Sequence, residues 1–303
     1  MSNKLSFVLI ALLMCSGARA EPGNSFFQGE IIMERVALFL SFEPYSKAQQ
    51  GFSQLNERLE EAAAMAADGR LDKAEEILDY SGYSSDAIAA ALQNLADEPG
   101  AELDEILQLE HALGQYEANS AEFMLALDTA MLRTLGKTDS EESRSLLASE
   151  HEKLQDAVEY RKARTIIKLK AVHEFSAAEA EHYIKQRMAA LGIRQEENMQ
   201  TLLKVGQGYA ALARERLEHA HDKGYNTDNL AGFIDKLQQA LRSGDMLVEQ
   251  RDFTGVRQLT RISQQISSLV LSEEDESMFE HEYLSQASHA VSEIGQLGNT
   301  STR

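Results

Sequence analysis

The chain has 303 residues, of which 49 are acidic and 29 are basic, giving a formal charge of −20 at pH 7. Because nucleic acids and anionic lipids are bound through basic surface, this charge makes both poor candidates as partners. Apolar residues make up 43% of the chain, which is enough for a folded core, and only 3 prolines are present to interrupt helices. The composition therefore excludes general disorder and favours long helices.

The first twenty residues have the pattern of a secretory signal peptide. Lys4 gives a basic start, residues 7–14 are apolar, and Ala18 and Ala20 stand three and one positions before a cut after Ala20. The apolar run is shorter than the ~20 residues of an uncleaved membrane anchor. Lipid attachment at Cys15 is the other alternative, but it requires a small residue before the cysteine. We expect a periplasmic or secreted protein with no stable membrane insertion after cleavage, and with no cysteine left.

A strongly apolar segment opens the mature chain. Residues 28–42 are apolar around most of the helical circumference, which predicts a helix buried on several sides. The alternative is a helix lying in a membrane surface, but Glu30, Glu34 and Arg35 do not form the basic face that such helices favour. We therefore expect this helix to belong to the core.

A helical hairpin follows. Pro44 stands in the first turn of a helix that Gly69 can end, and a second helix restarts shortly afterwards. The run 80–85 interrupts the pattern, and Ser84 or Ser85 can cap a short helix there. This helix is expected to turn Ile88, Leu92 and Leu95 inward, and Pro99 marks its end.

The remaining 204 residues contain no proline, and their apolar residues recur at helical spacing. Residues 102–135 predict a long helix with Ile106, Leu113, Tyr116, Phe123, Leu127 and Ala130 on one face, ended by Gly136. Thr138 or Asp139 caps the next helix, whose seam contains Leu147, Leu154, Val158, Thr165, Leu169 and Val172. Further helices are expected at 176–191, 195–223, 227–247, 256–269 and 273–297.

The predicted helices and the short breaks between them indicate an all-α protein built as an elongated antiparallel helical bundle or array of helical hairpins. The expected divisions are a signal peptide (1–20), an N-terminal hairpin module (21–98), a long connecting helix (99–137), a C-terminal bundle (138–298) and a polar tail (299–303). Residues 57–62 and 215–220 share the pattern Glu-Arg-Leu-Glu-x-Ala, a weak indication of internal duplication.

The segment after the signal resembles a known family. It opens with Pro22-Gly23-Asn24-Ser25-Phe26-Phe27, reaches Phe42-Glu43-Pro44 through the apolar helix, and carries Leu55-x-x-Arg58-Leu59-x-Glu61-Ala62 and Gly69-Arg70-x-Asp72-x-Ala74. Over residues 21–80 it is similar to an exported domain-of-unknown-function family of bacteria and archaea, whose mature chains open with Pro-Gly-Ser and an aromatic residue. This chain departs from that opening at Asn24 and has no lysine after the aromatic pair. The resemblance implies extracytoplasmic helical structure and no catalytic residue.

Two Glu-x-x-His pairs form the sharpest candidate site. Residues three apart share a helix face, and carboxylate-bridged di-iron bundles use two such pairs with further carboxylates. Glu110 or Glu150 could supply these, although their spacing does not mark them as ligands. Because glutamate is abundant here, such pairs also arise by chance. A metal-handling bundle is thus one alternative, with Glu179, His182, Glu218 and His221 as ligands.

Two other patterns favour structural roles. Gly206-Gln207-Gly208-x-x-Ala211 formally fits a dinucleotide-binding loop, but no strand is predicted before it, so we expect close packing of crossing helices. The basic cluster could dock an acidic partner, but we favour the interpretation that it neutralises neighbouring acidic helices. This cluster contains Arg161, Lys162, Arg164, Lys168 and Lys170.

No zinc-protease, nucleophile-elbow or phosphate-loop motif is present in the sequence. By elimination, we expect a non-catalytic extracytoplasmic helical binding or scaffold protein that engages a protein partner, with no cofactor and no nucleic acid. A periplasmic chaperone-like holdase for unfolded clients is the second alternative.

Overall fold

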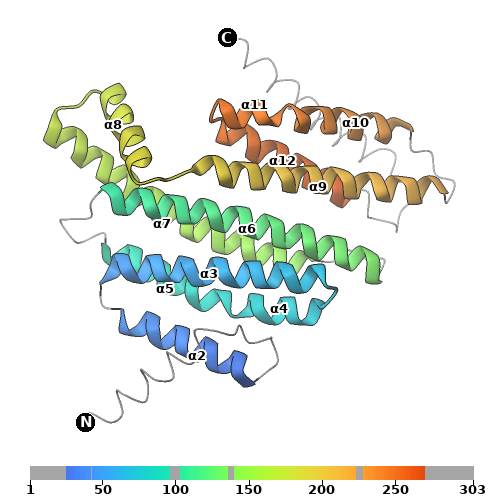
Figure 1. Cartoon of the computed structure of the whole chain (residues 1–303), viewed down its shortest axis with the longest axis horizontal. Helices are drawn as coiled ribbons and strands as arrows, with labels where there is room; N and C mark the ends of the chain where they lie inside the picture. Colours follow the sequence, from blue (N-terminus) through green and yellow to red (C-terminus); the bar gives the residue numbers. More distant parts are fainter. Residues whose placement is uncertain (1–24, 42, 96–102, 136–139, 223–227, 270–303) are drawn as a thin grey trace. The chain divides into compact units, whose positions relative to one another are not determined.

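The computed structural model describes residues 25–41, 43–95, 103–135, 140–222 and 228–269, and the regular secondary structure within these ranges is entirely α-helical (Figure 1). This confirms the predicted all-α class. The helices are α2 (Ser25–Leu40), α3 (Pro44–Ala67), α4 (Leu71–Asp79), α5 (Ser81–Leu95), α6 (Leu103–Leu135), α7 (Glu141–His173), α8 (Ala177–Ala190), α9 (Gln195–Asp222), α10 (Asp228–Arg242), α11 (Gly244–Glu249) and α12 (Phe253–Leu269).

Several predicted features lie outside the described residues. They are the signal peptide at 1–20, the family-like opening at 21–24, the breaks at Pro99 and Gly136, the caps at Thr138 or Asp139 and at Thr227, the last helix at 273–297 and the tail at 299–303. None of the helices described is both long and apolar enough to cross a membrane.

The chain divides into two compact units, and the division runs through the middle of α6. The first unit holds the described residues up to Asn119 together with Glu141–Ile193, and the second holds Ser120–Ser140 and the described residues from Arg194 onward. We expected instead a boundary at residue 98 and a separate connecting helix over 99–137. The difference arises because α6 contributes buried side chains to both cores, from Ile106 and Tyr116 in the first to Leu127 in the second.

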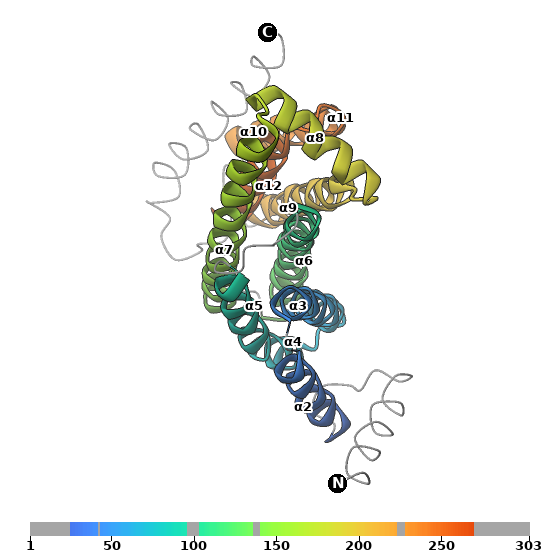
Figure 2. The same ribbon diagram turned by 90° about the vertical axis from the view of Figure 1, so that its left-hand side faces the viewer.

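In the first unit, α3 packs against both α4 and α5 (Figure 2). The two ends of α3 are set by local signals, as predicted. Glu43 caps its first turn by accepting from two backbone N–H groups, Pro44 follows, and Gly69 has a positive φ of 77° just after its end. Gly51 gives α3 room for close contact, because a Cβ there would lie 2.5 Å from Ile88 Cγ1 of α5.

The predicted interruption at 80–85 is confirmed only at Tyr80, which separates α4 from α5, because α5 begins at Ser81 and continues through the rest of the run. Ser84 and Ser85 therefore lie inside a helix and are buried, rather than capping a later one. Ile88 and Leu92 face inward as predicted, and the side chain of Leu95 lies outside the described residues.

In the second unit, α9 packs closely against α12 and also contacts α10 and α11. The glycine pattern lies inside α9, which confirms the packing interpretation. A Cβ on Gly206 would lie 3.0 Å from a Leu241 methyl and 3.3 Å from Thr260 Cα, and one on Gly208 would clash with a Leu125 methyl. The helix predicted over 227–247 is divided at Ser243 into α10 and α11.

Candidate interaction surfaces

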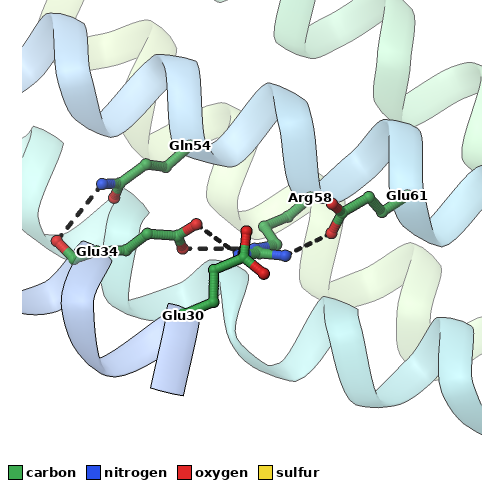
Figure 3. A network of polar contacts seen from close by, with 5 residues as sticks. All are labelled: Glu30, Glu34, Gln54, Arg58 and Glu61. Carbon is green, nitrogen blue, oxygen red and sulfur yellow. Dashed lines mark hydrogen bonds and ion pairs between the residues drawn. The ribbon is translucent and has the colours of Figure 1, made fainter. Parts of the chain in front are cut away.

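The first candidate surface is on α2, which a buried ion cluster attaches to α3. Arg58 of α3 is only 4% exposed. Its Nη2 lies 2.5 Å from Glu34 Oε1 and 3.5 Å from Glu30 Oε1, while its Nη1 lies 2.5 Å from Glu61 Oε2 (Figure 3). Gln54 adds a bond from its side-chain nitrogen to the Glu34 carbonyl at 3.4 Å. One guanidinium thus holds two turns of α2 against α3.

Three carboxylates surround the Arg58 guanidinium among the contacts of the described residues. Burial raises the pKa of the Glu34 carboxyl above its ordinary value, and the hydrogen bond from Arg58 offsets only part of that effect. Glu30 and Glu61 add repulsion in the same direction. Burial alone would lower the pKa of Arg58, but Glu34, Glu61 and Glu30 outweigh burial and raise it. Arg58 is therefore the charge on which the attachment of α2 depends.

The outer side of α2 is apolar and exposed, which corrects the expectation that this helix is buried on several sides. Among the large apolar side chains of α2 whose burial the structure describes, which begin at Ile31, only Ile31 and Leu38 are buried. We define the α2 stripe as Ile32, Val36, Phe39 and Leu40, which are 58%, 37%, 73% and 53% exposed. Their spacing of four, three and one residues places them on one helical face. The sequence pattern shows that all sides are apolar but not which side has a partner.

Arg35 fixes the rotation of α2 about its axis. Its guanidinium carbon lies 4.8 Å from the ring centre of Tyr83 and 5.8 Å from that of Tyr80. Together with the Arg58 cluster, this contact presents the α2 stripe in one orientation. An exposed apolar stripe that is held rigidly is a typical protein-binding feature.

A buried carboxylate forms the second feature of the first unit. Sequence analysis named Glu150 only as a possible extra metal carboxylate and missed that hydroxyl groups bind it in the interior. Glu150 of α7 is 6% exposed. Its carboxylate accepts from the Ser85 hydroxyl at 2.8 Å and the Tyr116 hydroxyl at 3.1 Å, and Ser81 Oγ lies 3.3 Å from both carboxylate oxygens. Gly82 leaves space beside it, since a Cβ there would lie 3.6 Å from Oε1. This cluster joins α5, α6 and α7.

Burial raises the pKa of the Glu150 carboxyl above its ordinary value. The hydrogen bonds from Ser85, Tyr116 and Ser81 lower it without cancelling that effect, and Asp86 adds repulsion. The signal that could have revealed the cluster is the pair Ser81 and Ser85, which stand one helical turn apart on the face that also carries buried Ile88 and Leu92.

The second half of α7 forms another exposed surface. Leu147, Leu154 and Val158 are buried as predicted, but Val172 is 75% exposed, so the predicted seam ends before the helix does. The reason is that α8, not a larger core, is the helix that contacts this end of α7. Phe175 in the turn stacks on His173 and contacts Tyr183, which fixes the α7–α8 turn.

The structure divides the basic cluster by role. Arg161 is buried, and Lys162 Nζ lies 2.7 Å from Glu110 Oε1 of α6, which confirms the neutralising interpretation for Lys162. It also gives Glu110 a structural role. Arg164 and Lys168 are exposed, and Arg164 lies over the Tyr160 ring of its own helix at 5.7 Å.

The predicted metal ligands lie in different units, Glu179 and His182 in the first and Glu218 and His221 in the second. Glu179 completes a capping box at the start of α8. Its carboxylate accepts from the Ser176 N–H at 2.8 Å, and its own N–H donates to Ser176 Oγ. Hydrogen bonding of the Glu179 carboxylate to the side chain of Ser176, and then to its backbone N–H, lowers the pKa of Glu179.

Within the described ranges, no three His, Cys, Asp or Glu side chains gather closely enough to hold a metal ion. The metal-handling alternative stays a prediction. Elemental analysis of the purified protein tests it, because it requires a stoichiometric metal that Glu179→Ala with His182→Ala removes.

Comparison with curated proteins and with solved structures gives no match. One family model does match, and it covers about a third of the chain, including α2 to α5 and the first part of α6. The α2 stripe and Arg58 lie inside the matched segment, whereas Glu150 and the whole of α7 lie outside it. Residues 19–122 thus match the family described as a domain of unknown function (DUF5667), which confirms the resemblance to a helical family of unknown function found over residues 21–80.

Proposed function

We propose that this protein is a non-catalytic, extracytoplasmic helical binding or scaffold protein, and that the α2 stripe is the surface that engages its protein partner. The observation that carries the proposal is the exposure of Phe39, at 73%, on a helix that buried Arg58 holds in place. Large apolar side chains gathered on one rigid face lose free energy when a partner covers them. A catalytic role would use none of these features.

Site-specific photocrosslinking in the producing cell tests this function. A photoreactive amino acid at Val36 should give a discrete crosslinked product, and Phe39→Ser should abolish it. The matched control places the same probe at Glu60, an exposed position on α3 in the same unit. Identical products from both positions, or none from Val36, would refute a binding role for the stripe.

Export is tested independently by the N-terminus of the processed protein. Cleavage after Ala20 gives a mature chain that begins at Glu21 and is found outside the cytoplasm. A cytoplasmic protein that retains Lys4 would remove the extracytoplasmic part of the proposal.

The α2 stripe also favours the holdase alternative, since holdases present apolar surface to unfolded clients. Suppression of aggregation of a chemically unfolded client by the isolated protein, lost on Phe39→Ser, would assign this activity. A stripe that binds one folded partner would instead leave client aggregation unchanged.

A further inference from the structure

The second half of α7 differs in charge from the rest of the chain. Residues 160–173 contain five basic side chains and no acidic one, in a protein with 49 acidic residues and 29 basic ones. Acidic residues stand on both sides of this stretch, with exposed Asp156 and Glu159 before it and exposed Glu174 after it. The stretch is therefore a short basic segment with acidic ends.

One face of this segment is exposed along its whole length. We define the α7 stripe as Tyr160, Arg164, Ile167, Lys168 and Ala171, all of which are exposed. Their spacing of four, three, one and three residues places them on one side of the helix. Tyr160 and Ile167 are 57% and 67% exposed, so the stripe combines apolar side chains with positive charge.

Arg164 lies over the Tyr160 ring, so the charges of this segment that can meet a partner are those of the lysines that follow it. Lys162 is neutralised by Glu110, but it lies off the stripe. Among the described residues, no carboxylate forms an ion pair with Lys168 or with its neighbour Lys170. These two lysines are available to an outside carboxylate without breaking an existing contact.

We propose that the α7 stripe binds an acidic amphipathic helix of a protein partner, with apolar side chains against Tyr160 and Ile167 and carboxylates against Lys168 and Lys170. A helix laid along α7 meets only the basic segment, because the stripe is narrow and about three turns long. A flat anionic bilayer would also meet Asp156, Glu159 and Glu174 at its ends. This inference deepens the proposed binding function by naming the chemistry of one partner surface.

The test uses the mature full-length protein and a synthetic helical peptide with a leucine stripe flanked by glutamates. Fluorescence anisotropy should show binding that weakens as salt is added, since Lys168 is exposed and Lys170 is only partly buried. Lys168→Glu with Lys170→Glu should weaken binding by about tenfold or more. The matched control, Lys204→Glu with Lys236→Glu, changes the net charge equally at two exposed lysines of the second unit and should bind within about twofold of wild type.

A second variant separates specific docking from charge attraction. Ile167→Ser should weaken peptide binding while leaving its salt dependence in place, and circular dichroism should show unchanged helix content for each variant. Equal weakening by both lysine pairs, or no binding by the wild type, would overturn the proposal. So would tighter binding to vesicles of phosphatidylglycerol and phosphatidylcholine, or self-association in light scattering that the Lys168→Glu, Lys170→Glu variant loses. If the Val36 crosslink persists in any of these cases, only this inference fails and the proposed function stands.

Discussion

Glu150 is a carboxylate that hydroxyl groups, rather than a cation, hold in the interior of the first unit. Because its folded-state pKa lies above the ordinary value of 4.5, the folded protein binds more protons than the unfolded chain as pH rises past 4.5. The contribution of Glu150 to stability is therefore present below that pH and is lost as pH rises through the raised folded pKa.

We predict that Glu150→Gln reduces this loss of stability with increasing pH. The amide keeps one acceptor for Ser85 or Tyr116 but cannot ionise. Urea unfolding midpoints measured from acid to neutral pH should fall less steeply in the variant than in the wild type. Glu152→Gln, at an exposed carboxyl on the same helix, should follow the wild-type curve. An unchanged slope in Glu150→Gln would show that the buried carboxyl does not control it.

Arg58 is the second residue whose removal has a defined cost. We predict that Arg58→Ala lowers the free energy of unfolding by about 3 kcal/mol, because it removes the buried guanidinium that binds the half-buried carboxylates of Glu34 and Glu61. Limited proteolysis should then cut near α2 before the rest of the first unit. Arg35→Ala is the control, since it removes only ring contacts with Tyr80 and Tyr83 and should leave α2 attached. Equal protease resistance in Arg58→Ala and wild type would contradict the anchoring role.

At the scale of elements, the contact between α3 and α5 depends on Gly51. We predict that Gly51→Ala destabilises the protein by about 1–3 kcal/mol, because its Cβ would lie 2.5 Å from Cγ1 of the fully buried, β-branched Ile88. Thermal or urea unfolding measures this loss. Gly232→Ala is the matched control in α10, where nothing lies within 4 Å of the added methyl, and it should be neutral or stabilising.

A double-mutant cycle identifies the cause. Ile88→Ala alone opens a cavity and is costly. In the Gly51→Ala background, Ile88→Ala should lower the free energy of unfolding by clearly less than it does in the wild type. The methyl of Ala at position 51 occupies part of the cavity, and the clash with Ile88 is removed. Strictly additive effects would show that the α3–α5 contact does not determine the cost.

Helix ends could be predicted from sequence wherever local chemistry sets them. Pro44 and Gly69 bound α3, and Ser176 caps α8, because each acts on backbone groups within a few residues. Ser85 was misassigned as a possible cap because its partner, Glu150, is 65 residues away in sequence. The exposure of the α2 stripe could not be predicted either, since periodicity shows that a face is apolar but not whether another element covers it.

The repeated Glu-Arg-Leu-Glu pattern shows how far a local signal extends. Arg58 in α3 and Arg216 in α9, which occupy the same place in the repeated pattern, are both buried. Each binds a helix other than its own. Arg58 binds carboxylates of α2 and α3, whereas Arg216 donates from Nη1 to the Ser267 carbonyl at 2.6 Å. The repeated pattern thus coincides with a buried arginine in both helices, and the neighbouring elements supply the groups that each arginine contacts.

At the scale of the whole molecule, α6 belongs to both units, and it is continuous across Asn119 and Ser120, where they divide. Tyr116 on one side binds Glu150 of the first unit, and Asp128 on the other accepts from Tyr209 of the second at 3.1 Å. An intact helix between these contacts links the unfolding of the two units, because fraying of one end removes backbone hydrogen bonds that support the other.

We predict that Ser120→Pro uncouples the two units and lowers the free energy of unfolding by about 3 kcal/mol, since proline removes a backbone hydrogen bond and clashes with the preceding turn. Differential scanning calorimetry should show two transitions that are further apart than any in the wild type. Ser120→Ala is the control at the same position. The Ser120 hydroxyl is buried without a hydrogen-bond partner among the described residues, so its removal should not destabilise the protein. If Ser120→Pro unfolds in the same pattern as Ser120→Ala, the continuity of α6 is not what couples the units.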